Sequence, residues 1–587
     1  MTISTLALIL AAAASATSPR PSIRYEVTVD SARTDVIGVI LHLRNAPKLV
    51  QLAMKVHPEY DARFWRYVEF ESKNVRRADT TLWEAAVANG SADIRYTIHL
   101  PRDTASSRRA WQCVVRGDGA LINPPDVLLY LPQFADAPAT IAIHAPASWR
   151  IATALATAGQ HALSAPNAEE MLDSPIMLGR IRQWGFDAGS TRFVVAYWPL
   201  PNAAPFDTTA LVSNIRAIAN AAIGIFRSAP SSTFWFLLQD GADDALEHLS
   251  SVTIGVPSAA LARDSRANAV QIAHEFFHTW NLVAIHPDNY GELTYRRSPA
   301  NGGLWLGEGV TLRYADVLVR RARLTDTADT RARHLEGLLS RYYGVPWSTS
   351  VSPEAASLAF GQTLLENPNA TSGYYLQGEL LGEALDAAIR DSTRDKRSLD
   401  DVMLALYERS RSGKGFSSQD VEHVASAVCG CRLASFFDRQ VRAAGLIDLA
   451  PAAARLGYRI VVDTIPAVDA EGTPIPDLRF NVAVVGDSAV ALAATYATGA
   501  WVRAGVRTGD VVESVNGVHP STVSQLLAAL RRLRVGDTVS LDVRRRGAAA
   551  HVNVVLRGYD RPRVRLVDLK AITPEQRQRR ARWLDGW

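Results

Sequence analysis

The chain has 587 residues, and 48% of them are apolar, which is enough for several domain-sized cores. Its 63 lysines and arginines nearly balance 59 aspartates and glutamates, leaving a formal net charge of +4. This balance argues against a nucleic-acid partner, which would favour a strongly basic protein.

The amino terminus begins with an apolar run, Leu6 to Ala14, that leads into the small-residue pattern Ala14-Ser15-Ala16. The run is too short to cross a bilayer and is typical of a secretory signal peptide. We therefore predict a signal peptide at 1–16 and export to the periplasm or secretion. Because no Lys or Arg precedes the run, an ordinary alanine-rich terminus is the alternative. No other stretch reaches 18 apolar residues, so we expect no membrane span.

Residues 22–203 are predicted to form an antiparallel, all-β amino-terminal domain. Runs of β-branched and aromatic residues bounded by turn residues occur at 25–29, 36–43 and 193–198. Long helical periodicity is scarce in this region. We expect this domain to contribute few catalytic residues.

Three cysteines, Cys113, Cys429 and Cys431, make an odd count. A disulfide is possible in an exported protein, but the Cys-Gly-Cys spacing fits neither a zinc knuckle nor a C-x-x-C redox motif. We interpret all three as structural.

The next segments alternate between helix and strand. Residues 207–227 are amphipathic and predict a helix, and 233–238 and 252–256 predict strands. Glu247 precedes the second strand and, taken alone, would be an ordinary surface residue.

The strongest chemical signal is His274-Glu275-Phe276-Phe277-His278. Residues four apart on a helix share a face, so His274 and His278 can bind the same ion. Glu275 lies beside them and can accept a proton from a water on that ion. This is the H-E-x-x-H arrangement of zinc peptidases. The alternative is a core helix whose histidines only form hydrogen bonds.

The residues around this motif predict a helix of about four turns. Asp264 and Ser265 are suitable N-cap residues, and no Gly or Pro interrupts 266–281. Four apolar residues at helical spacing predict a buried stripe: Val270, Ala273, Phe277 and Trp280.

A third ligand is predicted at Glu308, which opens a second amphipathic run. A carboxylate there would complete a His, His, Glu zinc site and leave the fourth position to water. Without the H-E-x-x-H helix, Glu308 would be a solvated acidic residue.

The segment 274–281, followed by Trp305-x-x-Glu308-Gly309-x-Thr311, resembles the glycyl aminopeptidase family. Its members are PDZ-containing relatives of the gluzincin zinc metalloaminopeptidases. The resemblance implies a thermolysin-like catalytic domain, which we place at 204–450. It also implies one zinc ion per chain and action on peptides with a free amino terminus.

The resemblance gives Glu247 a role. The family has a Gly-Gly-Leu-Glu-His segment here, whose Glu contacts the ammonium group of the substrate. This chain has Asp244 and Ala245 where the family has paired glycines. A preference for amino-terminal glycine is therefore open.

The resemblance also implies that Tyr375 is catalytic. The family has Tyr-x-Lys-Gly here, and its Tyr donates a hydrogen bond to the tetrahedral intermediate. Tyr375 matches that Tyr, and Gln377 replaces the Lys. Tyr374 is the less favoured donor and is predicted to contact substrate. The alternative is a tyrosine pair that packs at the start of a helix.

A segment at 502–518 resembles a PDZ domain, which we place at 455–560, with a helix at 524–533 and closing strands after it. A PDZ domain can bind an extended chain end by strand addition, or it can serve as a structural lid. Residues 456–459 are a weak candidate for the loop that meets a terminal carboxylate. In the tail, 561–587, a T-x-x-Q capping box at Thr573 predicts a short helix towards Trp583.

These features predict a multidomain α+β protein with an all-β amino-terminal domain, a thermolysin-like and mainly helical catalytic domain, and a carboxy-terminal PDZ domain. The expected function is a zinc-dependent aminopeptidase, with Gly and Ala as candidate first residues. One rival is a zinc endopeptidase in which Glu247 anchors nothing. The other is a non-catalytic protein that binds peptides through the PDZ domain.

Overall fold

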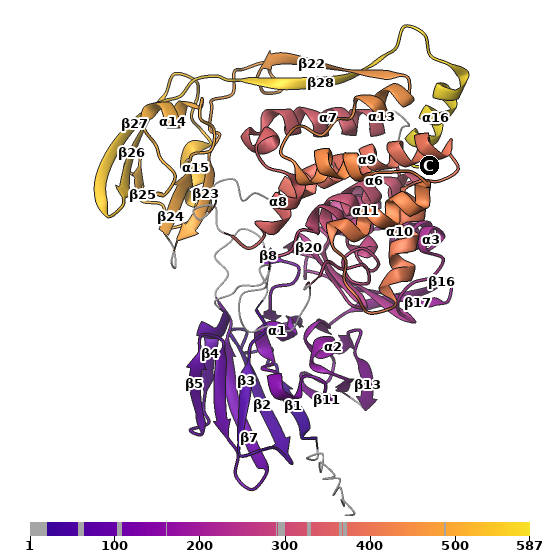
Figure 1. The fold of residues 1–587 in the computed structure, drawn as a ribbon. Coiled ribbons are helices and arrows are strands. Elements are labelled where there is room, and N and C mark those ends of the chain that lie inside the picture. The colour runs from indigo at the N-terminus through magenta and orange to yellow at the C-terminus, as the bar shows by residue number, and fades with distance from the viewer. Residues whose placement is uncertain are drawn as a thin grey trace, which may run out of the picture.

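The computed structural model describes residues 20–587 except 57–63, 102–107, 160, 289, 291–299, 326–329, 363–366, 368–372 and 486–488. A β-rich part, a helix-rich part and a small β part follow each other along the chain (Figure 1). This order confirms the predicted fold class. The predicted signal peptide, 1–16, lies outside the described residues.

The amino-terminal part contains three sheets. Their strand orders are β13-β14-β11-β1-β2-β7-β4, β12-β15-β10-β9 and β3-β6-β5. Neighbouring strands pair antiparallel, as predicted, apart from β1 and β11, which are parallel. The elements are β1 (Ser22–Thr28), β2 (Val36–Arg44), β3 (Leu49–Ala53), η1 (Phe64–Tyr67), β4 (Val68–Phe70), β5 (Val75–Asp79), β6 (Leu82–Ala86), β7 (Ser91–His99), β8 (Arg108–Arg109), β9 (Val114–Arg116), β10 (Gly119–Ile122), α1 (Pro124–Val127), η2 (Pro132–Phe134), β11 (Ala139–His144), β12 (Arg150–Ala152), β13 (Ala156–Gly159), β14 (Ala162–Ala165), α2 (Ala168–Leu172) and β15 (Ile176–Gly179).

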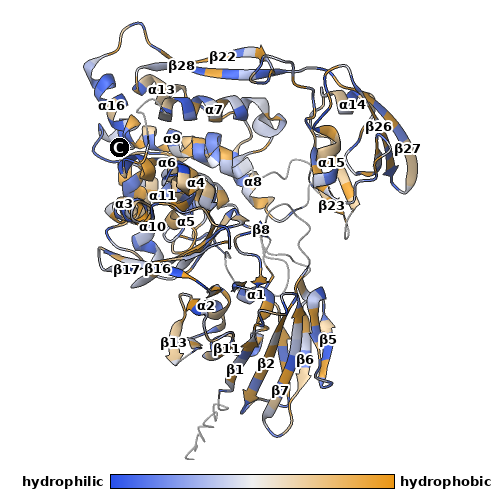
Figure 2. Ribbon diagram, turned by 180° about the vertical axis from the view of Figure 1, so that it is seen from behind, coloured by the Kyte–Doolittle hydropathy of each residue, from blue (hydrophilic) through white to orange (hydrophobic). Residues whose placement is uncertain are grey.

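The strands of this part form because apolar and polar residues alternate along them. In β7, Ala92, Ile94, Tyr96 and Ile98 are buried, and the polar residues between them lie on the outer face. The alternating colours along β2 and β7 show the same pattern in Figure 2. The buried faces of the strands build a core separate from that of the helical part.

The middle part is organised around one sheet, in the order β16-β17-β18-β21-β20. Its strands are β16 (Arg182–Ala188), β17 (Thr191–Trp198), β18 (Thr233–Gln239), β20 (Ala245–His248) and β21 (Ser251–Gly255). The three central strands are parallel, and β18 is buried on both faces, which explains its continuous apolar sequence. Because β16 and β17 belong to this sheet, the boundary predicted at residue 203 falls between two of its strands.

The helices of the middle part cover this sheet (Figure 1). Their bounds, with that of the short strand β19, are α3 (Thr208–Phe226), β19 (Ala242–Asp243), α4 (Ser258–Arg263), α5 (Ala269–Phe277), η3 (Trp305–Val310), α6 (Thr311–Arg321), α7 (Thr330–Gly344), η4 (Pro346–Thr349), α8 (Pro353–Leu358), α9 (Gly373–Thr393), α10 (Leu399–Ser410), α11 (Ser418–Cys429), α12 (Ala434–Phe437), η5 (Asp438–Arg442) and α13 (Ala450–Arg455).

Among the described residues, α3 is the one helix long and apolar enough by composition to cross a membrane. Asp207 caps it by accepting a hydrogen bond from the Ala210 amide, 2.9 Å away. The side chains of Leu211, Ile215 and Ile218 are buried in the core of the middle part, where α3 packs against β16, α5 and α10. The apolar face of α3 is therefore a core face.

The cysteines divide into a bonded pair and a free thiol. Cys429 and Cys431 form a disulfide around Gly430, which ends α11 in the left-handed conformation with φ 61°. Cys113 is free, and burial raises the pKa of its thiol well above the usual range. Its sulfur accepts a hydrogen bond from the Asn123 amide, 3.1 Å away.

The carboxy-terminal part carries the five-stranded sheet β23-β24-β25-β26-β27, which a two-stranded ribbon of β22 and β28 joins to the helices (Figure 1). Residues 456–459 lead into this ribbon rather than into the sheet, so the carboxylate-loop assignment is wrong. The elements are β22 (Tyr458–Pro466), β23 (Asn481–Val485), β24 (Ala489–Ala493), α14 (Ala500–Ala504), β25 (Asp510–Val515), α15 (Val523–Leu530), β26 (Thr538–Arg545), β27 (Ala548–Val555), β28 (Asp560–Asp568) and α16 (Pro574–Leu584).

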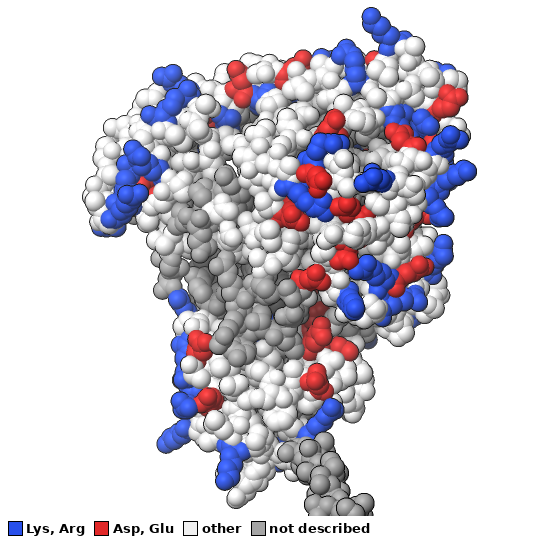
Figure 3. Space-filling view, viewed as in Figure 1, with Lys and Arg blue, Asp and Glu red and all other residues white. Residues whose placement is uncertain are grey.

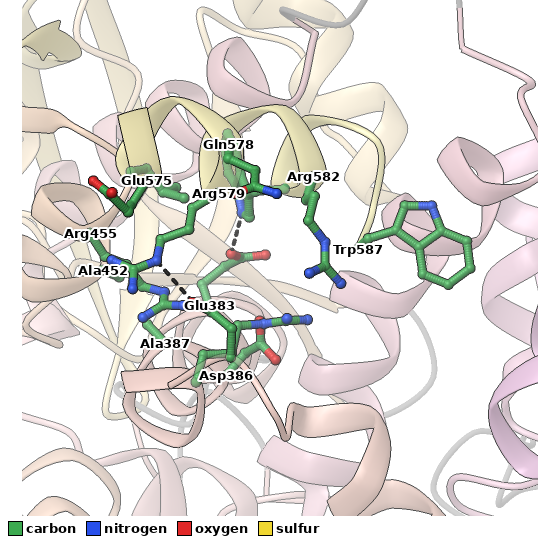
Figure 4. A pocket seen from close by; sticks show the side chains of 14 residues that line it. Glu383, Asp386, Ala387, Ala452, Arg455, Glu575, Gln578, Arg579, Arg582 and Trp587 are labelled. Carbon is green, nitrogen blue, oxygen red and sulfur yellow. Dashed lines mark hydrogen bonds and ion pairs between the residues drawn. The ribbon is translucent and has the colours of Figure 1, made fainter. Parts of the chain in front are cut away.

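The tail returns to the helical part. Thr573 and Gln576 form the predicted capping box, and α16 runs past Trp583 as expected. Side chains of α16 and of the chain end lie over α9 and α13 and line a small charged cavity with them (Figure 4). Elsewhere on the face seen in Figure 3, basic and acidic side chains are interspersed over the helices.

Candidate metal centre

The H-E-x-x-H motif lies on α5, but this helix is shorter than predicted. It begins after Asn268 and ends at Phe277, and His278 follows with helical backbone angles. The predicted cap, Asp264, instead ends α4 and accepts a hydrogen bond from the Arg266 amide, 2.9 Å away. Its carboxylate is therefore used in the turn between the two helices.

One position of the predicted buried stripe is wrong. Val270, in the first turn of α5, is 55% exposed. Further along, Ala273 and Phe277 on the helix and Trp280 just after it are buried, as predicted. The buried face thus develops towards the two histidines.

His274, His278 and Glu308 converge on one point. The His274 and His278 Nε2 atoms are 3.1 Å apart, and the Glu308 Oε2 atom lies 3.6 Å and 3.2 Å from them, respectively. A tetrahedral zinc with metal–ligand bonds of about 2.0–2.1 Å separates its ligand atoms by about 3.3 Å. The Glu308 Oε2 and the His274 Nδ1 atoms are buried and form no hydrogen bond within the described part of the chain. The donor set and its spacing therefore fit a zinc ion.

A buried asparagine aligns the ligand-bearing segments. The His278 Nδ1 atom donates to the Asn281 carbonyl, 2.9 Å away, which directs Nε2 towards Glu308. The fully buried Asn281 side-chain amide donates to the Leu306 carbonyl at 2.8 Å and to the Thr311 hydroxyl at 2.9 Å. These bonds join the end of α5 to the segment that carries Glu308. We did not predict this role, although Asn281 lies only three residues after the motif.

Glu308 lies in η3, a π-helical turn rather than the regular helix expected. Such turns occur frequently at functional sites, because they shift a side chain out of the helical register. Next to Glu308, Gly309 meets Gly378 of α9, and a Cβ on either glycine would collide with the backbone of the other segment. The absence of side chains at this crossing brings the first turns of α9 against the metal centre.

Two further carboxylates adjoin the ligands. Oxygen atoms of Glu247 and Glu275 and a ring nitrogen of His278 lie within 4.8 Å of one another. Glu247 comes from β20, the edge strand of the sheet, and the Tyr290 hydroxyl donates to it at 3.5 Å. The structure therefore brings together five of the seven predicted site residues.

The pKa values of the site residues are shifted by burial and by the short distances between their charged groups. Burial raises the pKa of Glu275 well above its usual range and also raises the pKa of Glu247, and Glu308 adds to both effects. Burial would lower the pKa of His278, but the charges of Glu308 and Glu247 outweigh it and raise this pKa to about 10. The two histidines in turn hold the pKa of Glu308 well below its usual range, although burial opposes them.

The edge strand that carries Glu247 is tied to the amino-terminal part. The His248 ring lies 3.3 Å from the Asp173 carboxylate, which also accepts a hydrogen bond of 2.8 Å from the Leu249 amide. Before this strand, Asp244 has a left-handed backbone with φ 59°, a conformation that favours glycine and that aspartate tolerates. Asp244 thus adopts a backbone conformation that a glycine would adopt without strain. The Asp173–His248 pair joins residues 75 positions apart, so a local pattern could not predict it.

Tyr374 and Tyr375 lie in the first turn of α9, with their rings stacked 4.8 Å apart. Tyr374 is buried and packs edge-on against Phe360, whereas Tyr375 is half-buried and lines an open cavity of about 330 Å³. Gln377, which replaces the lysine of the family, is fully buried, and its amide donates to the Val351 carbonyl at 2.7 Å. Tyr375 is thus the more accessible of the two tyrosines.

Comparisons with known proteins agree with this geometry. Residues 68–180 match the family model of the Peptidase M61 N-terminal domain, 268–381 match that of M61 glycyl aminopeptidase, and 487–556 match a PDZ domain. No curated protein matches the chain.

Two solved structures align with this chain to different extents. A protein of the aminopeptidase N family from Idiomarina loihiensis aligns with a TM-score of 0.74 and 19% identity, over 96% of this chain and all of that one. An M1 zinc metallopeptidase from Deinococcus radiodurans aligns with a TM-score of 0.44 and 14% identity, over 70% of this chain and 92% of that one.

Proposed function

The chain belongs to the M61 glycyl aminopeptidase family and is a zinc aminopeptidase, and on this basis we propose that it removes single residues from peptides with a free amino terminus. One observation supports this proposal above others. Three potential ligands, a buried glutamate for proton transfer and a second glutamate for the substrate amine share one small volume. This combination suits an aminopeptidase better than a general peptidase or a binding protein.

His274, His278 and Glu308 would hold one zinc ion, leaving room for water and substrate. When bound, zinc supplies Lewis acidity, which polarises the scissile carbonyl and makes a water molecule more acidic. The hydrogen bond from the His278 Nδ1 atom to Asn281 keeps the other nitrogen of that ring free to bind the metal. The Asn281 amide bonds keep Glu308 in register with the two histidines.

Glu275 acts as the general base and then as the general acid. The carboxyl adjoins His278 and is buried, and burial raises its pKa, which strengthens it as a base. It takes a proton from the attacking water and delivers it to the nitrogen of the leaving peptide. Such proton transfer contributes a factor of about 10²–10⁴ in rate.

Glu247 anchors the substrate by its ammonium group. A carboxylate at a set distance from the zinc ligands pairs with the charged amine and admits only one residue before the scissile bond. The protonated amine also stabilises the ionised form of Glu247, which burial alone disfavours. Release of one residue at a time follows from this arrangement.

Tyr375 stabilises the oxyanion of the tetrahedral intermediate by donating a hydrogen bond. One such donor lowers the barrier by about 2.7–4 kcal/mol in other enzymes. The position of Tyr375 at the first turn of α9, next to the crossing of Gly378 and Gly309, supports this role. Tyr374 packs beside it and holds its ring in place.

The test is hydrolysis of a panel of aminoacyl-nitroanilides together with amino-terminally acetylated peptides, with and without a zinc chelator. We expect chelator-sensitive cleavage of the free-amine substrates alone, and the ranking of these substrates shows whether Gly and Ala derivatives lead. Cleavage of the acetylated peptides would favour the endopeptidase. Absence of any cleavage by the zinc-loaded protein would favour the peptide-binding protein.

Location outside the cytoplasm is a separate proposal that rests on the apolar run before residue 16. Fractionation of cells that express the full chain, with sequencing of the mature amino terminus, tests it. A cytoplasmic protein with an uncleaved terminus would refute it.

A further inference from the structure

A cavity of about 330 Å³ opens where the catalytic part meets the PDZ part. Tyr375 and Leu312 line it on the side of the metal centre, and Arg341 and Trp347 line it on the side of α7 and η4. Asn481 and Tyr496 of the PDZ part complete the wall. Its volume lies within the range of sites that hold small organic ligands, about 300–1,000 Å³.

Two helices, α6 and α9, connect this cavity to the proposed catalytic residues. Leu312 lies in the first turn of α6, which continues η3 without a break, four residues after Glu308. Tyr375, the proposed oxyanion donor, is itself part of the lining. Glu247, which anchors the amine, lies on a third element, the strand β20. A substrate that extends from Glu247 past the metal therefore has this cavity available for the residues after the scissile bond.

The lining carries one cationic side chain, Arg341, and one carboxylate, Glu379. The Arg341 side chain is exposed and forms no ion pair or hydrogen bond with any residue that the structure describes. The acidic residue of the lining, Glu379, is already paired with the His334 ring at 2.6 Å. A planar guanidinium with free donors binds a carboxylate in a bidentate manner.

We propose that this cavity holds the carboxy-terminal end of short peptide substrates, with the Arg341 guanidinium bound to their terminal carboxylate. Asn481 and Tyr496 make the PDZ part the outer wall of this subsite, so the PDZ domain acts on the same peptide as the metal centre. This inference rests on the proposed aminopeptidase function and adds its substrate class: short peptides with a free carboxy terminus.

The test compares trialanine and tetraalanine with their carboxy-terminal amides. We expect the wild-type protein to show a kcat/KM at least about tenfold higher for an acid than for its amide, mainly through a lower KM, because only the acid can pair with the guanidinium. In Arg341→Gln this ratio falls to about one, and Arg341→Lys retains part of it because it keeps the charge.

The matched control is Arg333→Gln. Arg333 is exposed on the same helix, α7, and does not line the cavity. The acid-to-amide ratio of this variant equals that of the wild type. Thermal melting and zinc content of each variant confirm that it is folded and loaded.

Binding separates the failure of this inference from the failure of the proposed function. Calorimetric titration of Glu275→Gln with the same acid and amide measures the carboxylate contact without turnover. Equal affinities for acid and amide, or a preference for the acid that persists in Arg341→Gln, overturn the inference. Rates that rise with peptide length whatever the terminal group also overturn it, since they would indicate pairing along β23. If the zinc-loaded wild-type protein hydrolyses no peptide but Glu275→Gln still binds the acid more tightly than the amide, the proposed aminopeptidase function is refuted. The carboxylate subsite is supported in that case.

Discussion

At the scale of single residues, the metal centre combines charges that depend on one another. Glu308 and Glu247 raise the pKa of His278 to about 10, so its ring is protonated at neutral pH in the metal-free protein. A metal can bind only the neutral ring, so it must displace this proton. Protons therefore compete with the metal ion for the His278 ring.

We predict that zinc binding at pH 7 releases about one proton from His278 and that zinc affinity rises about tenfold per pH unit until the pH approaches 10. The sign follows from the raised pKa, since the competing protonated form predominates below it and disappears above it. Calorimetry in buffers of different ionisation enthalpy measures the proton count. A binding enthalpy that is independent of the buffer would contradict this prediction.

Glu275 separates proton transfer from metal binding, because it adjoins the ligands without belonging to the set that fits the ion. We predict that Glu275→Gln lowers kcat by a factor of about 10²–10⁴ and leaves the zinc content unchanged. Steady-state kinetics and metal analysis of the same preparation test this. The assignment of Glu275 as general base fails if the variant keeps its zinc and its activity.

At the scale of elements, the site depends on the contact between η3 and α9. Gly378 and Gly309 let the two backbones touch, which places the tyrosines of α9 beside the ligand Glu308. The π-helical turn and the Asn281 bonds determine where Glu308 lies relative to α5. A helix that moved away from η3 would change the metal centre without altering any ligand.

We predict that Gly378→Ala lowers the free energy of unfolding by about 1–3 kcal/mol, because the new Cβ collides with the Trp305 carbonyl and with Gly309. Zinc affinity should fall with it, since Glu308 is displaced. The control is Gly337→Ala on α7, where a Cβ meets no described residue outside its own helix within 4 Å and should stabilise the helix by about 0.5–1 kcal/mol. Urea denaturation and zinc titration of both variants measure these two quantities. Equal changes in unfolding free energy and zinc affinity in the two variants would show that the close contact between Gly378 and Gly309 is not the cause.

At the scale of the whole molecule, the chain leaves the helical part through β22, builds the PDZ part and returns through β28 (Figure 1). The ribbon is fastened to α7, where the Val564 amide donates to the Ser340 hydroxyl at 2.8 Å and the Leu566 amide donates to the Glu336 carboxylate at 2.6 Å. Helix α16 then closes the molecule over α9 and α13 (Figure 4). These contacts hold the PDZ part beside the cavity that contains Tyr375.

Trp583 is the main anchor of this closure. It is 6% exposed, its ring nitrogen donates to Glu383 at 2.8 Å, and the Arg331 guanidinium lies over its ring. We predict that Trp583→Ala lowers the free energy of unfolding by about 3–5 kcal/mol. Trp587→Ala is the control, because that residue is 54% exposed and its ring contacts the Arg321 guanidinium at the surface, so that its loss should cost about 1 kcal/mol or less. Similar denaturation midpoints for the two variants would contradict the anchoring role.

The sequence by itself determined the features that depend on residues close together in the chain. The spacing of His274 and His278 placed both on one helical face, a capping box marked the start of α16, and the Ala-Gly-Val and Val-Asn-Gly segments identified the PDZ domain. Glu308 could be named because it opens an amphipathic run after a recognised motif. Local spacing is preserved on folding, so such patterns survive into the structure.

Only the tertiary structure decided the features that join distant residues. It assigned β16 and β17 to the catalytic sheet, made the turn around Glu308 π-helical, and paired Asp173 with His248. It also exposed Val270 and led residues 456–459 into the ribbon rather than the PDZ sheet. Strand pairing, burial and cavity shape depend on which surfaces meet after the chain has folded. No spacing within one segment specifies those surfaces.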